Sequence, residues 1–539
     1  MRNFLYCLLL TITFNLFAAD PQLDSLLWEA TASNHGGNAS RAIDETLSSR
    51  WDTGTGQAAG QWFQVDLGEV CDVSRVEVDT TGSGGDYFRQ YALTVSLDGK
   101  EWQPAASGKG ELVTKITPPK PVTARYLRVT IPDGADLAGG FWSIHDFRVF
   151  GGAPFGKKEL PRPAIKWRLI KPTLPTRDAV VAAYSITDFG VNPAKGEDIT
   201  LPVRLATKLL ARAGGGTLWL PAGRYRLSEP IKLDNNTTIR GDWAPPEKGK
   251  PIVGTIVELT ANRGNPDGTP SIRLGDAGAV VGINFWWPEQ DATKIVPYPA
   301  AVQQVGGKGM GLENITFVNA YRGFACEADG CALFFLRNIY GTVLETGIEI
   351  DGTSDIGRME FIRLSPSYWS DSGLPKSPAA NGPHAAWMLE NGTGIAMRRN
   401  DWSYAWDVSL EGYKIGFYSL PSRERLGPKQ TKPGHPNGTN GKFRISKCRT
   451  GIQIHDISGA GMLFYDLQIT GAENGIVSEE TFEHHAEFQN TIVSATQTAV
   501  KLSGSGQFFF TNSQLTGAVE NDSGYIAFAG CKTSALDKA

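Results

Sequence analysis

Short stretches in which every second residue is apolar run through the first part of the chain, separated by turns rich in glycine, aspartate and serine. The clearest examples are residues 61–67, 74–78, 91–96 and 125–131. This alternation is expected of a strand that buries one face and exposes the other. Residues 22–152 are therefore predicted to form a β-sandwich.

Apolar residues recur at helical spacing in residues 201–210, which predicts a helix that begins near Glu197 and Asp198. The glycines at 214–216 end this helix, because glycine lets the chain reverse tightly into a strand. The strands expected on either side of the helix are residues 185–189, 217–220 and 225–227.

The rest of the chain repeats about every two dozen residues, with GIQI, GIV and AVKL beginning at positions 451, 475 and 499. Apolar strands lie between them, and asparagines at the turns are expected to stack from one repeat to the next. Such a period predicts a solenoid in which each repeat forms one coil. A β-propeller or a sandwich is the alternative, but a propeller repeat is longer and its blades have no capping helix.

The first residues combine Arg2, an apolar run at 4–17 and the small pair at 18–19. This is typical of a secretory signal peptide, residues 1–19, and predicts a secreted, periplasmic or cell-surface protein. A membrane anchor is the alternative, but the run is short and no basic flank follows it. We expect no integral membrane segment in the mature chain.

The charge balance argues against two classes of partner. Lys and Arg number 52 against 56 Asp and Glu, so the net charge of -4 gives no electrostatic reason to bind nucleic acid or an anionic membrane. The 14 tryptophans and 62 glycines favour a strand-rich protein that handles sugars. Cys326 and Cys331 could pair, with buried thiols as the alternative. No pattern indicates an oligomeric state.

Five pieces of the first module occur in the order of a known family: AIDETLSSRW (42–51), QWFQVDLG (61–68), YALTVSLDGKEW (91–102), ARYLRVTI (124–131) and HDFRVFG (145–151). They resemble the coagulation-factor type C, or discoidin, domain and its related carbohydrate-binding modules. The resemblance implies a jelly-roll sandwich that binds sugars through loops at one end. The residues expected to contact sugar are His35, Asn38, Tyr87, Arg89 and Trp142, each with a surface or packing role as the alternative.

The same resemblance implies a structural calcium ion beneath the loop 42–51. By position, Asp44 and Ser49 would supply side-chain oxygens, Ala42 a carbonyl, and Asp146 a carboxylate where the family usually has Glu. Oxygen ligands of this kind suit Ca²⁺. Thr46 departs from the pattern, because a second Asp is common there. The alternative is a loop in which Asp44 caps its own backbone.

Residues 186–227 contain a predicted strand, an acidic helix start, three glycines and two further strands. This order resembles the N-terminal cap of the pectate-lyase superfamily of right-handed parallel β-helices. There the helix covers the open end of the solenoid. The expected fold is all-β, a discoidin-like sandwich plus a right-handed parallel β-helix with an N-terminal capping helix. The expected parts are a signal peptide (1–19), the sandwich (22–152), a Pro-rich linker (153–180) in which Trp167, Leu169 and Ile170 should find cover, and the β-helix (181–539).

Two polar insertions, 365–392 and 419–441, interrupt the repeat and are expected to wall a groove. Catalysis on this scaffold is expected on an exposed strand face within such a groove. The acid–base candidates are Asp351, Asp355, Asp401, Glu411 and Glu289, and the substrate-binding candidates are Arg358, Trp369, Trp402 and Trp406. For each carboxylate a turn cap or ion pair is the alternative. His384, His435 and His455 could be bases, although isolated loop histidines are usually bystanders.

These features predict a glycoside hydrolase that cleaves a polysaccharide with two carboxylates and needs no cofactor for catalysis. No paired Asp-Asp and no Gly-His-Gly is found in the sequence. The resemblance in fold therefore does not indicate which reaction the protein catalyses. A polysaccharide lyase acting on uronic acids is the first alternative. A non-catalytic glycan-binding surface protein, whose β-helix is only a stalk, is the second.

Overall fold

The computed structural model describes residues 20–137, 140–152, 161–304, 306–423 and 433–534. The predicted signal peptide and the middle of the 419–441 insertion lie outside the described residues. The chain divides into two compact units between residues 159 and 160. Within the described ranges, no helix is both long and apolar enough to cross a membrane.

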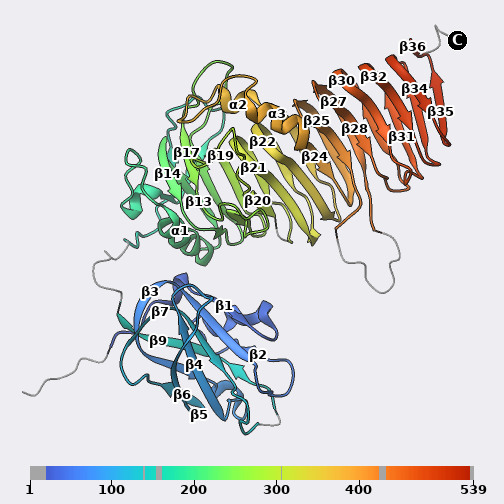
Figure 1. Ribbon diagram of the computed structural model, residues 1–539. Helices are drawn as coiled ribbons and strands as arrows, with labels where there is room; N and C mark the ends of the chain where they lie inside the picture. The colour runs from blue at the N-terminus through green and yellow to red at the C-terminus, as the bar shows by residue number, and fades with distance from the viewer. Residues whose placement is uncertain (1–19, 138–139, 153–160, 305, 424–432, 535–539) are drawn as a thin grey trace, which may run out of the picture. The chain divides into compact units, whose positions relative to one another are not determined.

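The first unit is an antiparallel sandwich built around one long strand, β3 (Figure 1). Its main sheet has the order β1-β3-β7-β4-β5, while β6 and β9 pair with the second half of β3 and β2 pairs with β8. The strands are β1 (Glu29–Ala32), β2 (Trp51–Asp52), β3 (Trp62–Asp79), β4 (Gln90–Ser96), β5 (Gln103–Lys109), β6 (Val113–Ile116), β7 (Val122–Thr130), β8 (Ser143–Ile144) and β9 (Asp146–Gly152). Short 3-10 helices are η1 (Ser25–Leu27), η2 (Gly36–Ala42) and η3 (Thr81–Ser83).

The sandwich core is aromatic at its centre. The Trp51 ring lies 4.9 Å from Phe63 and 5.1 Å from Trp142, and Phe63 continues to Phe147 at 5.6 Å. All four side chains are buried. The inward residues of the alternating segments supply this core, as the period of two predicts.

The second unit opens with a small antiparallel pair, β10 (Arg168–Ile170) and β11 (Val180–Ala182). Of the three apolar residues expected to find cover, Ile170 packs against Val180, Ala182 and Trp219. The other two do not, because Trp167 is 58% exposed and Leu169 75% exposed.

The predicted helix is present as α1 (Thr200–Arg212), which packs against the first strands of the stack. Asp198 Oδ1 accepts hydrogen bonds from the Thr200 N–H at 2.9 Å and its hydroxyl at 2.6 Å. The glycines at 214–216 all have positive φ, between 89° and 146°, which explains why glycine is needed for the reversal.

The strand predicted at 185–189 is wrong. β12 (Tyr184–Ser185) ends there, and a 3-10 helix, η4 (Ile186–Phe189), follows. Ser185 and Asp188 form a capping box that starts this helix.

Beyond α1 the chain winds in a stack of parallel strands, each paired with the equivalent strand of the next coil (Figure 1). Three faces run along the stack, and the longest strands turn corners between them. The first face contains β13 (Gly216–Leu220), β16 (Thr237–Gly241), the start of β19 (Ala279–Trp286), β21 (Gly311–Cys331), β22 (Phe335–Thr353), β23 (Arg358–Leu364), β25 (Asn400–Glu411) and β27 (Pro436–Ser446), then β29 (Met462–Tyr465), β31 (His485–Gln489), β33 (Gln507–Thr511) and β35 (Tyr525–Ala529).

The second face contains β14 (Gly223–Leu227), β17 (Thr255–Leu259), the later parts of β19 to β27, and the start of β30 (Gln468–Ser478), β32 (Ile492–Leu502) and β34 (Gln514–Asn521), with β36 (Lys532–Thr533). The third face contains β15 (Ile231–Lys232), β18 (Ile272–Leu274), β20 (Ala300–Gln304), the ends of β21 and β22, β24 (Thr393–Met397), β26 (Ile415–Ser419), β28 (Thr450–Ile454) and the ends of β30, β32 and β34.

Equivalent residues of successive coils stack inside and at the corners. The rings of Phe464, Phe488 and Phe510 follow one another at 5.5 Å and 4.8 Å. At the corner between the first and second faces, Asn338 Nδ2 donates to Asn314 Oδ1 at 2.8 Å, and both residues have positive φ. Asparagine tolerates this conformation, and the predicted stacking of asparagines occurs at this pair.

The insertion at 365–392 is partly helical rather than a plain loop. It contains α2 (Ser367–Ser370) and α3 (Pro383–Asn391), with proline at the first position of α3. This insertion leaves the second face and returns to the third.

Candidate functional site

One edge of the sandwich gathers polar and aromatic side chains. His35 Nδ1 lies 3.4 Å from Asp52 Oδ1, and Arg50 Nε donates to Asp52 Oδ2 at 3.2 Å. Arg50 Nη1 also lies 3.9 Å from Asp86 Oδ2. The predicted His35 therefore belongs to a charged network that includes three residues not predicted from the sequence.

Tyr87 and Arg89 continue this edge. The Arg89 guanidinium lies 3.7 Å above the Tyr87 ring and donates to the Tyr87 carbonyl at 2.8 Å. Gln57 Nε2 donates to the carbonyls of Tyr87 and Phe141, which brings the 39% exposed Phe141 to the same edge. Asn38 is exposed in η2.

Trp142 is not a sugar-contacting residue, and its prediction is wrong. Its side chain is fully buried, edge-on to Trp51 and Phe88. The exposed aromatic ring of this segment belongs instead to the preceding residue, Phe141. Two adjacent aromatic residues in a strand-like segment point to opposite sides, and the sequence does not say which one faces out.

The predicted calcium loop has its carboxylates close together. Ser49 Oγ donates to Asp44 Oδ2 at 2.6 Å, and Asp44 Oδ1 accepts from the Thr46 N–H at 3.2 Å. Burial raises the pKa of Asp146, and the carboxylates of Asp79, Glu45 and Asp44 raise it further against the opposing effect of Arg148. Ala42 is buried at the end of η2. Asp44 therefore bonds to the backbone of its own loop at Thr46.

Among the residues that the structure describes, no group of three or more His, Cys, Asp or Glu side chains is arranged to hold a metal ion. The calcium ligand set would rely on a carbonyl and a hydroxyl in addition to carboxylates.

A group of titratable side chains lies where the third face turns toward the first. We call His435, His455, Asp456, Glu479 and His484 the histidine cluster. His455 Nδ1 lies 2.8 Å from Glu479 Oε2, and His484 Nδ1 lies 3.0 Å from Asp456 Oδ1. The His435 ring stacks on that of His455, with 6.0 Å between centroids. Two carboxylate–histidine pairs thus stand side by side.

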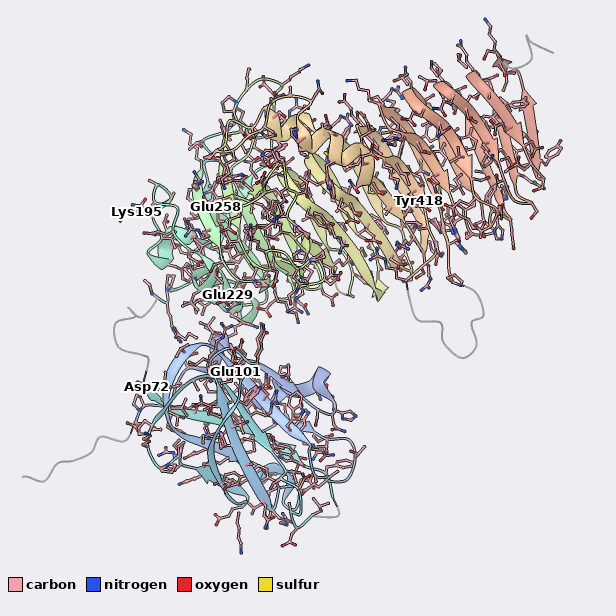
Figure 2. The ribbon with its side chains drawn as sticks, viewed as in Figure 1. Asp72, Glu101, Lys195, Glu229, Glu258 and Tyr418 are labelled. Carbon is pink, nitrogen blue, oxygen red and sulfur yellow. The ribbon has the colours of Figure 1, made fainter. Side chains whose placement is uncertain are left out.

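Tyr418 and Gln453 extend the histidine cluster onto the third face, where Figure 2 labels Tyr418 on β26. The Tyr418 hydroxyl and Gln453 Nε2 each donate to Glu479 Oε1 at 2.6 Å. Burial opposes ionisation of Glu479, but the hydrogen bonds from Tyr418, Gln453 and His455 prevail and hold its pKa below the usual value. Burial and the bond to Glu479 raise the pKa of Tyr418, which keeps its proton.

An arginine–carboxylate group adjoins the cluster on the preceding coils. Arg398 Nε donates to Glu349 Oε1 at 2.6 Å, and Arg423 Nη2 lies 2.8 Å from the same oxygen. The predicted Asp351 is buried beside them and accepts from the Ser422 hydroxyl at 2.8 Å and the Arg423 N–H at 2.7 Å.

Three other predicted residues lie at this same corner. Asp355 is exposed in the turn after β22, and Asp401 and Trp402 are exposed at the start of β25. The Thr353 N–H donates to the Arg399 carbonyl at 3.3 Å, which holds the two turns together. The corner thus brings Asp351 and Asp355, at the end of β22 and in the turn after it, near Asp401 at the start of β25.

Glu411 lies elsewhere, at the end of the second-face part of β25. It accepts from Ser365 Oγ at 3.0 Å and pairs with Lys447 Nζ at 2.6 Å. The cavity around it has a volume of about 410 Å³ and is bounded by the loop at 246–252 and the 365–392 insertion. Glu411 does not join the carboxylates of the corner.

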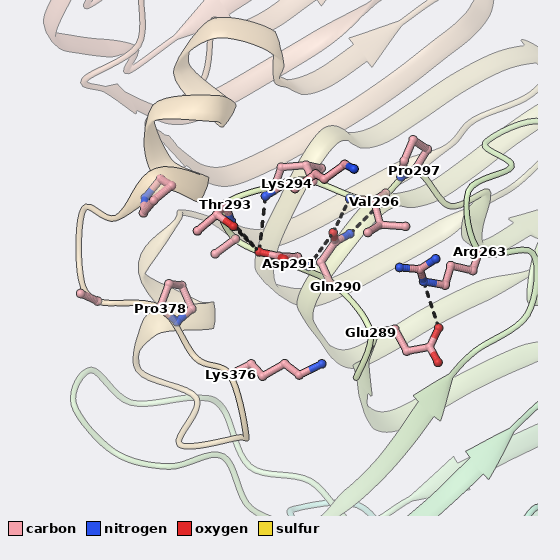
Figure 3. Close-up of a pocket in the computed structure, with 14 residues that line it drawn as sticks. Arg263, Glu289, Gln290, Asp291, Thr293, Lys294, Val296, Pro297, Lys376 and Pro378 are labelled. Atoms are coloured by element: carbon pink, nitrogen blue, oxygen red, sulfur yellow. Dashed lines mark hydrogen bonds and ion pairs between the residues drawn. The ribbon is translucent and has the colours of Figure 1, made fainter.

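Glu289 lies in a third place, a cavity of about 950 Å³ beside the 365–392 insertion (Figure 3). Its carboxylate pairs with Arg263 at 3.1 Å, and both side chains are more than half exposed. Lys294 and Lys376 line the same cavity. This position fits the ion-pair alternative stated for Glu289.

Trp369 is wrong as a sugar-stacking residue, because its side chain is fully buried. Its ring lies 5.3 Å from His384, and its backbone N–H donates to Thr342 Oγ1 at 2.9 Å. His384 is also buried and bonds to the Pro366 carbonyl at 3.0 Å. Both residues anchor the 365–392 insertion onto the coil.

No sequence pattern had indicated the histidine cluster as a unit. His455 and Glu479 are one repeat apart, so the period of the solenoid could have paired them. Tyr418 and His435 could not be placed in this way, because the 419–441 insertion interrupts the register.

A model of the F5/8 type C domain matches residues 29–147. These residues therefore form a discoidin-type domain, as predicted. No match was found among curated proteins.

Among solved structures, the chain is similar to the family 32 carbohydrate-binding module of NanJ from C. perfringens in complex with galactose, at 26% identity over 24% of this chain and 97% of that chain, with a TM-score of 0.22. It is similar to the Clostridium perfringens module CpGH89CBM32-5 in complex with GalNAc-β-1,3-galactose, at 21% identity over 24% of this chain and 100% of that chain, with a TM-score of 0.22. A mutant of chitosan-binding module 1 from the chitosanase/glucanase of Paenibacillus sp. IK-5 shares 29% identity over 23% of this chain and 93% of that chain, with a TM-score of 0.20.

Proposed function

We propose that this protein is a secreted carbohydrate-active enzyme that cleaves a uronic-acid-containing glycan by elimination. The observation that carries the proposal is the His455–Glu479 pair, with Tyr418 donating to the same carboxylate. The N-terminal module would hold the protein on its glycan, and the histidine cluster would supply the acid–base chemistry.

The scaffold in this proposal is a right-handed parallel β-helix of the pectate-lyase type. The parallel pairing of successive coils and the position of α1 at the start of the stack support it. In such a scaffold an exposed strand face with loops on both sides is a natural place for a long chain-like substrate.

Elimination needs a base that removes the proton next to the uronate carboxylate. The lowered pKa of Glu479 favours its carboxylate form, so His455 Nδ1 would donate in their hydrogen bond, and in the neutral imidazole Nε2 would then carry the lone pair. His455 Nε2 would take the C5 proton, the C4–O bond would break as the C4–C5 double bond forms, and the departing oxygen would take a proton from water. Arg423, whose side chain is half exposed, would offset the substrate carboxylate.

Hydrolysis by two carboxylates is the second candidate, favoured by the presence of Glu349, Asp351, Asp456 and Glu479 at one corner. A glycosidase needs one carboxyl that keeps its proton at working pH. The lowered pKa of Glu479 disfavours that role for it, and Glu349 is held between two guanidinium groups. These contacts favour elimination.

A polysaccharide panel tests the reaction. Elimination gives both new reducing ends and the ultraviolet absorbance of an unsaturated uronate, whereas hydrolysis gives reducing ends alone. Acidic glycans such as polygalacturonate and alginate should give both signals. Reducing ends without absorbance would replace the lyase by the hydrolase, and neither signal on any glycan would favour the non-catalytic stalk.

We also propose that a calcium ion binds beneath the loop 42–51 and stabilises the N-terminal module. The raised pKa of Asp146 supports this, because a cation would offset the repulsion among Asp146, Asp44 and Glu45. Without an ion, the raised pKa means that the folded state favours the protonated form of Asp146. The stability that this form contributes is fully present below the unfolded pKa of Asp146 and is lost as the pH rises through its folded pKa.

Chelation should therefore lower the melting temperature of the isolated module at neutral pH. An ion at a hundred times its Kd contributes about 2.7 kcal/mol, which corresponds to a shift of several degrees. Scanning calorimetry of residues 20–152 with and without a chelator measures the shift, which should shrink as the pH is lowered and Asp146 binds a proton. The Asp44→Asn variant should not respond to the chelator. If the unsubstituted module has the same melting temperature with and without the chelator, and elemental analysis finds no metal, the proposed site is wrong.

A further inference from the structure

The outward side of the first face carries a patch of aromatic side chains that the chemistry above does not use. We call Trp402, Tyr404 and Trp406 on β25, with Tyr465 on β29, the aromatic platform. Trp402 is 54% exposed and Tyr404 43% exposed, while Trp406 and Tyr465 are partly exposed. Large aromatic rings exposed together on a flat strand face are a feature of binding surfaces.

A glycine lets two of these rings meet. Gly441 lies between Trp406 and Tyr465 in the parallel register, and the two rings lie 5.5 Å apart across it. A Cβ atom at Gly441 would come within 2.5 Å of the Tyr465 ring and 2.6 Å of the Trp406 ring. Any other residue at this position would push the rings apart, so the platform depends on this glycine.

Trp402 is held in an unusual conformation. Its φ is +53°, where bulky residues are rarely found, and a register shift between Asn400 and Ser403 pushes it outward. A side chain that is 54% exposed gains only part of the burial of a core tryptophan, so packing gives this conformation limited support.

The platform begins beside the histidine cluster. The Trp402 N–H donates to Asn437 Oδ1 at 2.6 Å, and Asn437 Nδ2 donates to Ser458 Oγ at 3.1 Å. Asn437 and Ser458 each follow a member of the histidine cluster by two residues, His435 and Asp456 respectively. A chain lying in the candidate active site can therefore continue onto the platform.

Cations lie along the platform. Lys442 Nζ lies 4.8 Å above the Trp406 ring, and the exposed Arg358 lies next to Tyr404 in the register of the neighbouring strand. Aromatic rings can stack on the apolar faces of pyranose rings, while ammonium and guanidinium groups pair with carboxylates. The combination suits a sugar chain that carries negative charge.

We propose that the aromatic platform binds an acidic polysaccharide chain and holds the part of the substrate that extends beyond the histidine cluster. This inference rests on the proposed function for the class of glycan, but it concerns binding and not cleavage. It adds Tyr404, Lys442 and Tyr465 to the residues that contact substrate.

Native electrophoresis of the full chain through gels containing polygalacturonate or alginate tests the proposal without any need for turnover. Trp402→Asn is the most informative variant, because Asn accepts positive φ more readily than Trp and should keep or raise the melting temperature. Its dissociation constant from retardation should rise about fivefold or more, the scale of losing one aromatic contact. Tyr404→Ala should weaken binding similarly.

Tyr525→Ala is the matched control, since Tyr525 is 57% exposed on the same face near the end of the stack. It should leave retardation unchanged. If both platform variants are retarded as strongly as the unsubstituted chain, the platform adds nothing to the glycan binding of the N-terminal module and the proposal is wrong, whether or not the enzyme cleaves the glycan. The same conclusion follows if neither acidic gel retards the unsubstituted chain. If the platform variants lose retardation and the unsubstituted chain cleaves no glycan, the result would support glycan binding by the platform and contradict the proposed lyase activity.

Discussion

Replacing His455 with asparagine should lower the turnover of an acidic glycan by about a hundredfold or more, the scale typical of losing a general base. The reason is the pair in which Glu479 holds His455 Nδ1 at 2.8 Å and leaves Nε2 to accept a proton. Absorbance of the unsaturated product measures the rate. The melting temperature should change little, because His455 lies at a partly exposed corner and not in the interior of the coil.

The control for this experiment is His485→Asn. His485 is one residue from the histidine cluster along the chain, but it lies on β31 with its ring 6.5 Å from Phe509. This variant should keep near-normal turnover. Equal activity in the His455 and His485 variants would show that the cluster is not the catalytic site. A Glu479→Gln variant should lose activity as well, because the neutral amide no longer favours the base-competent tautomer of His455.

Replacing Phe488 with alanine should destabilise the coil stack by about 3–5 kcal/mol, the usual cost of emptying a buried phenylalanine site. Phe488 is fully buried, and its ring is stacked between Phe464 at 5.5 Å and Phe510 at 4.8 Å. The coils above and below share the resulting cavity, so neither can collapse into it without moving the other. Urea unfolding followed by tryptophan fluorescence measures the loss.

Phe528→Ala provides the comparison. Phe528 continues the same row of rings, 5.6 Å beyond Phe510, but it is 40% exposed near the end of the stack. Removing it empties no enclosed space, so the loss should be well below that of Phe488→Ala. Equal losses would mean that stability is not set by burial within the stack.

Local patterns predicted much of the fold because they reflect the environment of each side chain. Apart from Gln61, the alternating segments of residues 61–67 and 74–78 lie in β3, and the helical spacing at 201–210 lies within α1. The incorrect prediction of a strand at 185–189 also has a local cause. Ser185 and Asp188 have the spacing of a capping box, and these cap contacts outweighed the strand pattern.

The functional residues were harder to predict, because exposure depends on contacts between distant segments. Trp369 and Trp402 are the same residue type in neighbouring segments, yet one is fully buried under an insertion and the other is 54% exposed. Similarly, Glu411 and Asp351 are both acidic residues near strand ends, but they lie at different corners of the coil.

By itself, the sequence determined that the chain contains a discoidin-type module and, after it, a chain of repeating strands with a helix at its start. Those features follow from periodicity and from motifs whose residues are close in sequence. Only the tertiary structure decided that Tyr418 meets the His455–Glu479 pair, since the 419–441 insertion separates Tyr418 from these two residues and displaces the register along the chain. A side chain's chemistry is fixed by its type, but its partners are fixed by how the coils align.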